Sequence, residues 1–305
     1  MANPEYIWMD GKLVKWADAT VHVQTHALHY GSSVFEGIRA YASPDGPKVL
    51  FLHEHVSRLY ASARLFRMEI PYSAEEMTAA IKQVVRENKH ESCYIRPLVY
   101  RGDEALGVNP RRCGVHATIL TMVWGSYLGA EAIESGVDVG VSSWRRTVPG
   151  VGMSMAKIGG QYVNSQMMAM EAHDHGYHEA IALDTQGNVS EGSGENIFVI
   201  SNGVIYTPPM AASILLGITR NGVMRIAHSM GYEVREQNMP RDFLYIADEI
   251  FFTGTAAEVT PIRSVDKVKI GSGSRGPITA RIQQAFFDIV NSRAADQWGW
   301  LTPVN

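Results

Sequence analysis

The sequence predicts an α/β protein of two domains, and three observations support this fold class. The 305 residues, 46% hydrophobic and 19% charged, are enough for two domains with apolar cores. The sequence contains strand signals, such as the Asp10-Gly11 turn between apolar runs, and also helix signals, such as the helical spacing of apolar residues in 53–67. Two glycines and two aromatic residues interrupt the chain between 124 and 129. We expect a small domain of residues 1–122, a linker of residues 123–134 and a large domain of residues 135–305.

Charge, hydropathy and cysteine content exclude several classes of protein. A net charge of −4 without a Lys/Arg cluster indicates no positively charged surface that could bind nucleic acid. No apolar run approaches the roughly 18 residues that a membrane span needs. Cys93 and Cys113 are too few for a disulfide framework. The polar N-terminus, residues 2–5, lacks the basic and apolar regions of a signal peptide. These features predict a cytoplasmic protein that binds neither nucleic acid nor membrane.

The first half of the chain alternates strand and helix signals. Residues 7–14 predict a hairpin, because Asp-Gly is the strongest short-range hairpin signal. Residues 53–67 predict a helix that leaves Arg58 at the margin of its buried stripe, and Ser73 to Glu76 form a capping box that opens another helix. Strands at residues 92–101 and 115–123 follow.

The second half continues this alternation. A strand begins near Val137, residues 163–172 form a helix, and residues 178–183 form a strand that ends in a turn. Asn202-Gly203 predicts a second hairpin, and a helix begins near residue 218. Residues 249–252 predict the last clear strand, and another helix starts at Pro277.

Histidines at positions 22, 26 and 29 have a spacing that would suit a metal on a helix. The β-branched residues between positions 21 and 25 favour an extended segment instead, which would spread the imidazoles apart. We therefore predict no metal site. The aromatic and glycine residues from Tyr30 to Tyr41 are either core packing beside turns or the wall of a pocket.

One face of the strand at residues 92–101 carries Tyr94 and Arg96, because side chains alternate with a period of two. An arginine beside tyrosines favours an anion, although an amphipathic sheet surface with a snorkelling arginine has the same pattern. In the linker, Trp124 and Tyr127 are candidates for a lid over a ligand or for packing between domains.

Lys157 lies among small residues, next to Ala156 and close to Gly159-Gly160. Missing side chains let a flat ligand approach the backbone and leave the amine in a partly dry site. Desolvation lowers the pKa of a lysine, so this amine could form a Schiff base with an aldehyde and act as a general base. Taken alone, a lysine is usually a solvated surface charge.

Glu191 lies in a second run of small residues, Ser190 to Glu195, which taken alone would be a turn. Two other stretches would expose backbone N–H groups to an anion: the helix start at Leu216 to Arg220 and the strand end at Thr253 to Glu258. Residues 271–276 match G-x-G-x-x-G, but too little chain follows for a dinucleotide-binding unit. We predict a surface loop there.

The motifs at Lys157 and Glu191 resemble the fold-type IV pyridoxal phosphate enzymes, and the likeness runs from Tyr6 to Leu301. Within that class IV aminotransferase group, the sequence is most similar to the bacterial branched-chain aminotransferases. The resemblance implies two mostly antiparallel α/β domains with pyridoxal 5'-phosphate in the cleft between them. It implies amino transfer between leucine, isoleucine or valine and 2-oxoglutarate, with ping-pong kinetics. A homodimer would be the smallest functional assembly, and a homohexamer is a further expectation.

The resemblance also assigns roles to individual residues. Lys157 is the catalytic residue, Glu191 binds the ring nitrogen of the cofactor, Tyr162 its phenolic oxygen, and Arg58, Ile218 and Thr219 its phosphate. Thr255 and Ala256 serve the phosphate and the substrate α-carboxylate, in a division that stays open. Arg96 binds the distal carboxylate of glutamate and Tyr94 the α-carboxylate side, whereas Phe35 and Gly37 line the pocket. Tyr30 and Val108 reach the pocket of the neighbouring subunit. Leu216 departs from the proline of many relatives.

Several alternatives stay open at this point. A D-amino acid aminotransferase, an (R)-amine transaminase and an aminodeoxychorismate lyase share the lysine and glutamate, but the Tyr94-x-Arg96 pattern and the Gly107 to Pro110 turn favour the branched-chain enzyme. A nicotinamide oxidoreductase and a catalytically idle binding protein are alternatives from other classes. The preference among leucine, isoleucine, valine and aromatic substrates is undetermined. Arg39 could be a second anion-binding group, and Glu195 could be a turn residue.

Overall fold

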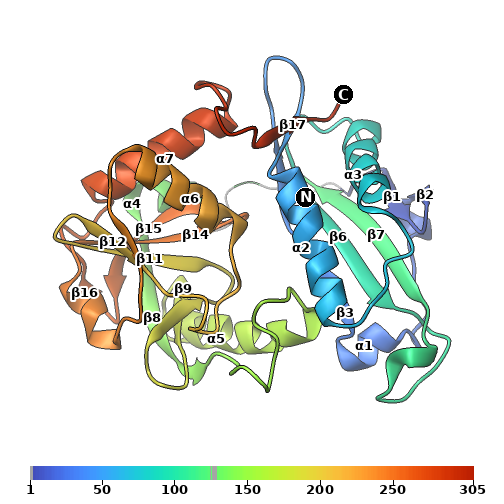
Figure 1. The fold of residues 1–305 in the computed structure, drawn as a ribbon, viewed down its shortest axis with the longest axis horizontal. Coiled ribbons are helices and arrows are strands. Elements are labelled where there is room, and N and C mark those ends of the chain that lie inside the picture. The colour runs from blue at the N-terminus through green and yellow to red at the C-terminus, as the bar shows by residue number, and fades with distance from the viewer. Residues whose placement is uncertain (1–2, 124, 126–128) are drawn as a thin grey trace. The chain divides into compact units, whose positions relative to one another are not determined.

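The chain forms two compact units in a computed structural model that describes residues 3–123, 125 and 129–305. The described part of unit 1 comprises residues 3–123, 156–162 and 290–305, and that of unit 2 comprises residues 125, 129–155 and 163–289. Each unit combines helices with a sheet, which confirms the predicted α/β class (Figure 1). The predicted linker includes residues outside the described ranges, so its boundaries stay a prediction.

Unit 1 contains an eight-stranded sheet in the order β17-β5-β4-β6-β7-β1-β2, with β3 also paired to β6. Its pairings among the described strands are antiparallel, as predicted. The strands are β1 (Tyr6–Met9), β2 (Lys12–Lys15), β3 (Ser33–Phe35), β4 (Ile38–Tyr41), β5 (Lys48–Leu50), β6 (Cys93–Arg101), β7 (Val115–Met122) and β17 (Leu301–Pro303). The helices are α1 (His26–Tyr30), α2 (Leu52–Leu65) and α3 (Ala74–Glu87), with 3-10 turns η1 (Trp16–Asp18), η2 (Pro110–Arg112) and η3 (Gly159–Gln161).

Two local sequence signals form as predicted in unit 1. Asp10 and Gly11 have φ angles of 45° and 88°, the left-handed conformation that a tight hairpin turn needs between β1 and β2. Ser73 accepts a hydrogen bond from the Glu76 N–H at 3.2 Å, and the Glu76 carboxylate accepts one from the Ser73 N–H at 2.7 Å. This capping box satisfies two N–H groups at the start of α3.

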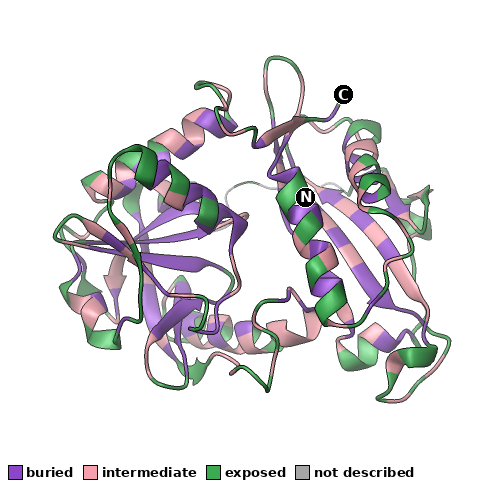
Figure 2. Cartoon of the chain, in the orientation of Figure 1, coloured by how far each residue is buried: buried purple, intermediate pink, exposed green. Residues whose placement is uncertain are grey.

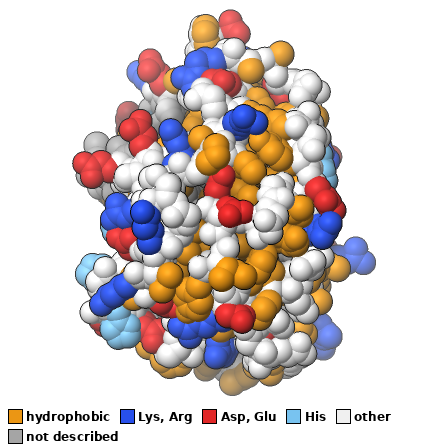
Figure 3. All heavy atoms as spheres, turned by 90° about the vertical axis from the view of Figure 1, so that its left-hand side faces the viewer, with side chains coloured by type: hydrophobic (Ala, Val, Ile, Leu, Met, Phe, Trp, Pro, Cys, Tyr) orange, Lys and Arg blue, Asp and Glu red, His pale blue; other side chains and the backbone are white. Residues whose placement is uncertain are grey.

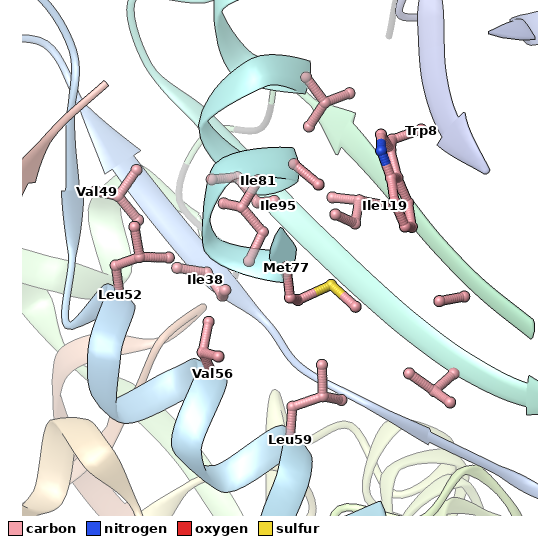
Figure 4. Packing of buried hydrophobic residues seen from close by; sticks show 14 of the residues in the cluster. Trp8, Ile38, Val49, Leu52, Val56, Leu59, Met77, Ile81, Ile95 and Ile119 are labelled. Carbon is pink, nitrogen blue, oxygen red and sulfur yellow. The ribbon is translucent and has the colours of Figure 1, made fainter. Parts of the chain in front are cut away.

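The core of unit 1 lies between one face of its sheet and helices α2 and α3. Figure 4 shows Leu52, Val56 and Leu59 of α2 and Met77 and Ile81 of α3 pointing toward strand residues that include Ile38, Ile95 and Ile119. Each helix is buried on one side only, as its helical spacing predicts, and β6 and β7 have alternating stretches of higher and lower burial (Figure 2).

The opposite face of this sheet carries an apolar groove with a volume of about 620 Å³. Its lining includes Met9, Leu98, Tyr100 and Leu120 of the sheet and Leu28 of α1. Leu98 and Tyr100 are on the same face of β6 as Arg96, because they alternate with it along the strand. The face predicted to bind substrate therefore continues into an apolar surface.

Unit 2 contains a nine-stranded sheet in the order β10-β9-β8-β15-β14-β11-β12-β13, with β16 paired to β15. Strand β8 is parallel to β9 and β15, and β12 is parallel to β13, whereas the other described pairings are antiparallel. The strands are β8 (Val137–Arg145), β9 (Glu179–Leu183), β10 (Val189–Gly192), β11 (Asn196–Ser201), β12 (Val204–Thr207), β13 (Val234–Glu236), β14 (Glu249–Gly254), β15 (Glu258–Val265) and β16 (Val268–Lys269). The helices are α4 (Ala130–Ser135), α5 (Tyr162–Asp174), α6 (Ile218–Ser229) and α7 (Pro277–Val290), with a 3-10 segment η4 (Arg241–Ile246).

The G-x-G-x-x-G stretch at residues 271–276 lies in turns between β16 and α7, which confirms the predicted loop. The strand after α7, β17, pairs with β5 in the sheet of unit 1, so this stretch does not open a βαβ unit. Among the described residues, no helix has both the length and the apolar character needed to cross a membrane.

Residues 156–162 pack onto unit 1 through backbone contacts. Ile158 forms an antiparallel bridge with Val34, and the Gly160 N–H donates to the Gly31 carbonyl at 3.0 Å. A Cβ atom on Gly31 would lie 2.5 Å from the Gly160 Cα, and the φ angle of Gly31 is +62°. The close approach of these two backbone segments therefore requires glycine at position 31.

We expect Gly31→Ala to destabilise the protein more than Gly176→Ala does. Both glycines follow a helix with positive φ, but a Cβ on Gly176 would meet nothing within 4 Å. The conformational strain is thus similar in the two variants, and the clash with Gly160 adds about 1–3 kcal/mol for Gly31→Ala. Denaturant unfolding of both variants measures this difference. An equal loss of stability in the two variants would contradict the requirement for glycine where the backbone of residue 31 meets that of residue 160.

Candidate functional site

The backbone N–H and the backbone carbonyl of Lys157 are both hydrogen-bonded to other segments of unit 1. Its N–H donates to the Ser62 hydroxyl at 3.0 Å, and its carbonyl accepts from the Phe35 N–H at 3.1 Å. Ser62 is fully buried on α2, and Phe35 ends β3. A Cβ on Gly159 would lie 2.3 Å from the Ser33 hydroxyl oxygen. The small residues beside Lys157 thus allow its segment to lie directly against β3.

The amine of Lys157 lies among aromatic groups. Its Nζ donates to the Tyr162 hydroxyl at 2.5 Å and lies 4.8 Å from the centre of the Phe35 ring. The Phe35 and Tyr162 rings meet edge to face with centroids 4.9 Å apart. A hydroxyl partner and two aromatic faces hold the amine in a defined position, which is what a nucleophile that also moves protons requires.

Phe35 also contacts the predicted substrate-binding strand. The Arg96 guanidinium carbon lies 4.7 Å from the Phe35 ring centre, and Arg96 Nη2 donates to the Tyr94 hydroxyl at 2.9 Å. A Cβ on Gly37 would lie 2.0 Å from the Tyr94 hydroxyl oxygen, so glycine leaves the space that this phenol occupies. The structure therefore brings together five of the predicted residues of unit 1: Lys157, Tyr162, Phe35, Tyr94 and Arg96.

Arg58 belongs to a buried network with Glu36 and His55. Its Nε donates to Glu36 Oε1 at 2.6 Å and its Nη2 to Oε2 at 2.9 Å, while His55 Nδ1 lies 2.7 Å from Oε2. Burial alone would raise the pKa of the fully buried Glu36 carboxyl, but the charges and hydrogen bonds of Arg58 and His55 hold that pKa far below its usual range. The bidentate pair fixes the plane of the Arg58 guanidinium.

In unit 2, the Glu191 carboxylate on β10 is held by three donors. Arg146 Nη2 lies 2.6 Å from Oε1, and Oε2 accepts from the Leu215 N–H at 3.0 Å and from Asn196 Nδ2 at 3.2 Å. The Glu191 side chain is only 7% exposed. A carboxylate so buried keeps its charge because it is paired and hydrogen-bonded.

Asn196 connects Glu191 to the start of α6, where Ile218 and Thr219 are the first helical residues. Its Nδ2 also donates to the Leu215 carbonyl at 2.9 Å, and a Cβ on Gly217 would lie 1.8 Å from Asn196 Oδ1. Glycine at the N-cap thus makes room for this amide. The N-terminus of α6 is a helix end suited to an anion.

Thr255 and Ala256 directly follow a strand, as predicted, and the structure adds that they lie in a short hairpin between β14 and β15. Glu195, whose role the sequence leaves open, is 5% exposed, and its Oε2 accepts from the Gly194 N–H at 3.0 Å. It is therefore a buried carboxylate, whereas an ordinary turn residue would be exposed. Arg39 lies on β4 opposite Tyr94 of β6.

The residues predicted to reach a neighbouring subunit are at the surface of unit 1. Tyr30, the last residue of α1, is 47% exposed, and Val108, in the loop after β6, is 84% exposed. The two linker candidates, Trp124 and Tyr127, lie outside the described residues. Their predicted roles stay a prediction.

The prediction of an extended segment at the three histidines is wrong, because His26 begins helix α1. His26 is buried against Ser32, whereas His29 Nε2 lies 2.9 Å from the Val23 carbonyl at the surface. Turns, rather than a strand, precede the helix, so β propensity at positions 21 and 23 is overridden. Within the described ranges no group of three His, Cys, Asp or Glu side chains could hold a metal.

Sequence reasoning missed the residues that hold the predicted ones in place: Glu36, His55, Ser62, Arg146 and Asn196. Two weak signals existed, since Glu36 is a charged residue between Phe35 and Gly37 in an apolar stretch, and Ser62 lies one helical turn after Arg58. Arg146 lies directly after a strand and has no local motif. Such partners are recognised only when distant segments are in contact.

The comparisons with known proteins concern nearly the whole chain. The family model "Amino-transferase class IV" matches residues 33–265. The chain is 50% identical over 302 residues to the branched-chain-amino-acid aminotransferase of Escherichia coli strain K12, which covers 99% of this chain and 98% of that protein.

Two solved structures extend this similarity to the fold. A crystal structure of the Escherichia coli branched-chain amino acid aminotransferase matches with a TM-score of 0.97 at 50% identity, over 99% of this chain and 100% of that chain. The branched-chain amino acid aminotransferase of Thermobaculum terrenum, in its PLP-bound holo form, matches with a TM-score of 0.93 at 34% identity, over 100% of both chains.

We expect Glu36→Gln to lower the free energy of unfolding by about 3–5 kcal/mol at pH 7, because the Arg58 charge then stays buried without its counter-ion. The Glu36 pKa is lower in the folded chain than in the unfolded chain. The stability that ionised Glu36 contributes is therefore fully present above its unfolded pKa, near 4.3, and is lost as the pH falls from there toward the folded pKa. The difference in the free energy of unfolding between wild type and Glu36→Gln should become smaller as the pH falls from about 5 to about 3. Urea unfolding at several pH values measures it.

Glu69→Gln is the matched control, because Glu69 is exposed. It should change stability by less than about 0.5 kcal/mol. A difference between wild type and Glu36→Gln that is constant with pH would contradict the role of the Glu36 charge.

Proposed function

Because this chain belongs to the class IV aminotransferase family, we propose that it transfers the amino group between branched-chain L-amino acids and 2-oxoglutarate with pyridoxal 5'-phosphate as cofactor. The observation that carries this proposal is the arrangement around Phe35. The Lys157 amine and the Arg96 guanidinium both lie within 5 Å of its ring centre. A group that can bond to an aldehyde and a group that can bind a carboxylate are thus held close together.

The described residues of unit 1 fit the cofactor. Lys157 would bind its aldehyde carbon, and the Tyr162 hydroxyl, already hydrogen-bonded to Nζ, would bind its phenolic oxygen. Arg58, with its guanidinium plane fixed by Glu36, would bind the phosphate. Gly159 and Gly160 lack side chains, which lets the segment of Lys157 lie against Ser33 and Gly31. Pyridoxal phosphate supplies an aldehyde and an electron-withdrawing ring that stabilises negative charge at the substrate α-carbon.

The described residues of unit 2 supply the complementary groups. Glu191 would bind the ring nitrogen and keep it protonated, since Arg146 and Asn196 hold its carboxylate in one orientation. Ile218 and Thr219 would bind the phosphate at the N-terminus of α6. Thr255 and Ala256 would bind the phosphate and the substrate α-carboxylate from the β14–β15 hairpin.

Lys157 would also move the proton that transamination requires. Its Nζ would accept the proton from the substrate α-carbon and would donate it to the exocyclic carbon of the cofactor. The Tyr162 hydroxyl keeps Nζ in place through its hydrogen bond, and the Phe35 ring excludes water from one side of the amine. The same nitrogen is therefore nucleophile first and base afterwards.

The pocket must accept both an apolar side chain and a second carboxylate. Phe35, Gly37 and Tyr94 would give leucine, isoleucine or valine a dry wall, and Arg96 would pair with the distal carboxylate of glutamate. Arg96 Nε is buried without a hydrogen-bond partner in the described protein, which is consistent with an anion as its missing partner. Trp124 and Tyr127 would complete the pocket from the linker.

A second copy of the chain would cover the apolar groove on the sheet of unit 1. The groove lies on the same face of β6 as Arg96, and exposed Tyr30 and Val108 would reach from one protomer to the pocket of its partner. We propose a homodimer as the functional assembly and a homohexamer as its larger form. Figure 3 views the side that carries elements of unit 2, not this groove, and hydrophobic side chains gather there as well. Such a face is typical of a surface that another chain covers. We place the enzyme in the cytoplasm.

Lys157→Ala should abolish covalent attachment of the cofactor. Borohydride reduction of the wild type should fix labelled pyridoxal phosphate to the chain at Lys157, and the variant should carry no label. Turnover of leucine should fall by several orders of magnitude, because nucleophile and base are lost together. Exposed Lys12 provides the control, Lys12→Ala, which should keep full label and turnover. Label still bound to the Lys157 variant would disprove the assignment.

Arg96→Leu should separate the two substrates. The kcat/KM for glutamate and for 2-oxoglutarate should fall by an amount that corresponds to about 2–5 kcal/mol, the usual cost of removing one member of a buried charge pair. Reaction with leucine should be nearly unchanged, because its side chain carries no charge. Single-turnover kcat/KM for each half-reaction measures the two substrates on one preparation. Equal losses for both would mean that Arg96 binds the α-carboxylate or supports the fold, and Arg39 would then be the better candidate for the distal carboxylate.

A further inference from the structure

Both ring nitrogens of the buried His26 are bonded to segments other than its own helix. The residue is 1% exposed, its Nε2 lies 2.8 Å from the Gly107 carbonyl, and its Nδ1 lies 2.6 Å from the Ser32 hydroxyl. A carbonyl oxygen only accepts, so Nε2 carries the hydrogen, and in the neutral ring Nδ1 then accepts from the Ser32 hydroxyl. The imidazole joins the loop after β6 to the turn after α1.

Exposed Tyr30 is the last residue of α1 and directly precedes the turn that His26 contacts, and exposed Val108 lies in the loop after β6. The His26 ring lies against the Tyr30 ring with centroids 4.5 Å apart and an interplanar angle of 36°. Gly107 directly precedes Val108 and has a φ angle of +130°, a conformation that other residues rarely adopt. The direction of the Gly107 carbonyl toward His26 thus depends on glycine.

The rest of this loop is anchored at its base. Glu104 Oε2 accepts from the Gly114 N–H at 2.8 Å, and the Cys113 thiol donates to the Ala105 carbonyl at 3.3 Å. Gln24 Nε2 donates to the Asp103 carbonyl at 2.8 Å. The backbone N–H of His26 also donates to the Gly102 carbonyl at this base, at 2.8 Å. Its imidazole acts further along, next to Val108, so the side chain fixes the tip of the loop.

We propose that His26 is a positioning residue that holds Tyr30 and Val108 in the arrangement needed to complete the substrate pocket of the partner subunit. This inference rests on the proposed function, in which these two side chains reach that pocket. It predicts an effect of His26 on substrate binding in trans, with no effect on cofactor binding within its own protomer.

Two amide substitutions separate the two bonds of His26. The amide nitrogen of glutamine can take the place of Nε2 and keep the bond to the Gly107 carbonyl, whereas the shorter asparagine reaches only the position of Nδ1. His26→Asn should raise the KM for leucine about tenfold, the loss expected for one buried hydrogen bond. His26→Gln should restore most of the wild-type KM. Cofactor affinity should be the same in both variants.

Hydrogen exchange gives a readout that does not depend on activity. The amides of Arg111 and Cys113, which donate to Asn109 Oδ1 and to the Pro110 carbonyl just after the tip of this loop, should exchange about tenfold faster in His26→Asn than in wild type and should be protected again in His26→Gln. His29→Asn is the matched control, because His29 lies on the same helix with its ring at the surface. It should change neither the KM nor the exchange.

Mixed dimers test whether His26 acts on the partner. In a dimer of His26→Asn with Lys157→Ala, the working pocket receives Tyr30 and Val108 from a protomer with His26 intact, so its KM should be that of wild type. In a dimer of wild type with the double variant, the working pocket receives them from the altered protomer, so its KM should rise about tenfold. The reverse pattern, or equal KM values in both dimers, would overturn the proposal.

Other outcomes are also decisive. The proposal is overturned if His26→Asn changes the KM no more than His29→Asn does. It is also overturned if His26→Gln shows the same losses as His26→Asn in KM, in cofactor affinity and in thermal stability, because His26 then only supports the fold. Wild-type protein that binds cofactor but does not turn over leucine would overturn the proposed function instead. Faster exchange in the loop of His26→Asn would still support the fixing of its tip in that case.

Discussion

The attachment of residues 156–162 to the first unit is the constraint on which the rest of the site depends. Lys157 is held through its own backbone by Ser62 and Phe35, and Gly160 meets Gly31 at a distance that excludes any side chain. Backbone hydrogen bonds fix the position of the Lys157 Cα and leave its side chain for chemistry. A lysine placed by its side-chain contacts alone would lose its position whenever those contacts changed.

The buried carboxylates show how the fold keeps charge inside without large cost. Glu36 is paired with Arg58 and His55, and Glu191 with Arg146 and Asn196, so each ionised group has donors in place of water. These pairs add little net stability, but each has a defined geometry. That geometry sets the direction in which the Arg58 guanidinium and the Glu191 carboxylate point.

Patterns within a few residues were predicted correctly, because the physical cause lies in those residues. The Asp10-Gly11 turn and the Ser73 capping box are local in this sense, since backbone strain and N–H satisfaction decide them. The segment before His26 shows the limit. Its β-branched residues favour a strand, but it forms turns and a short helix instead, packed through the buried imidazole.

The sequence by itself determined the α/β class, most helix and strand positions, and the chemical types of the candidate residues, because periodicity, turn chemistry and composition are local properties. The tertiary structure decided which side chains hold those residues. Lys157 and Ser62 are separated by 95 positions, and His26 and Gly107 by 81. No local pattern encodes such a pair, since many serines and carbonyls could serve equally well. The choice is made only when packing of the whole core fixes which segments meet.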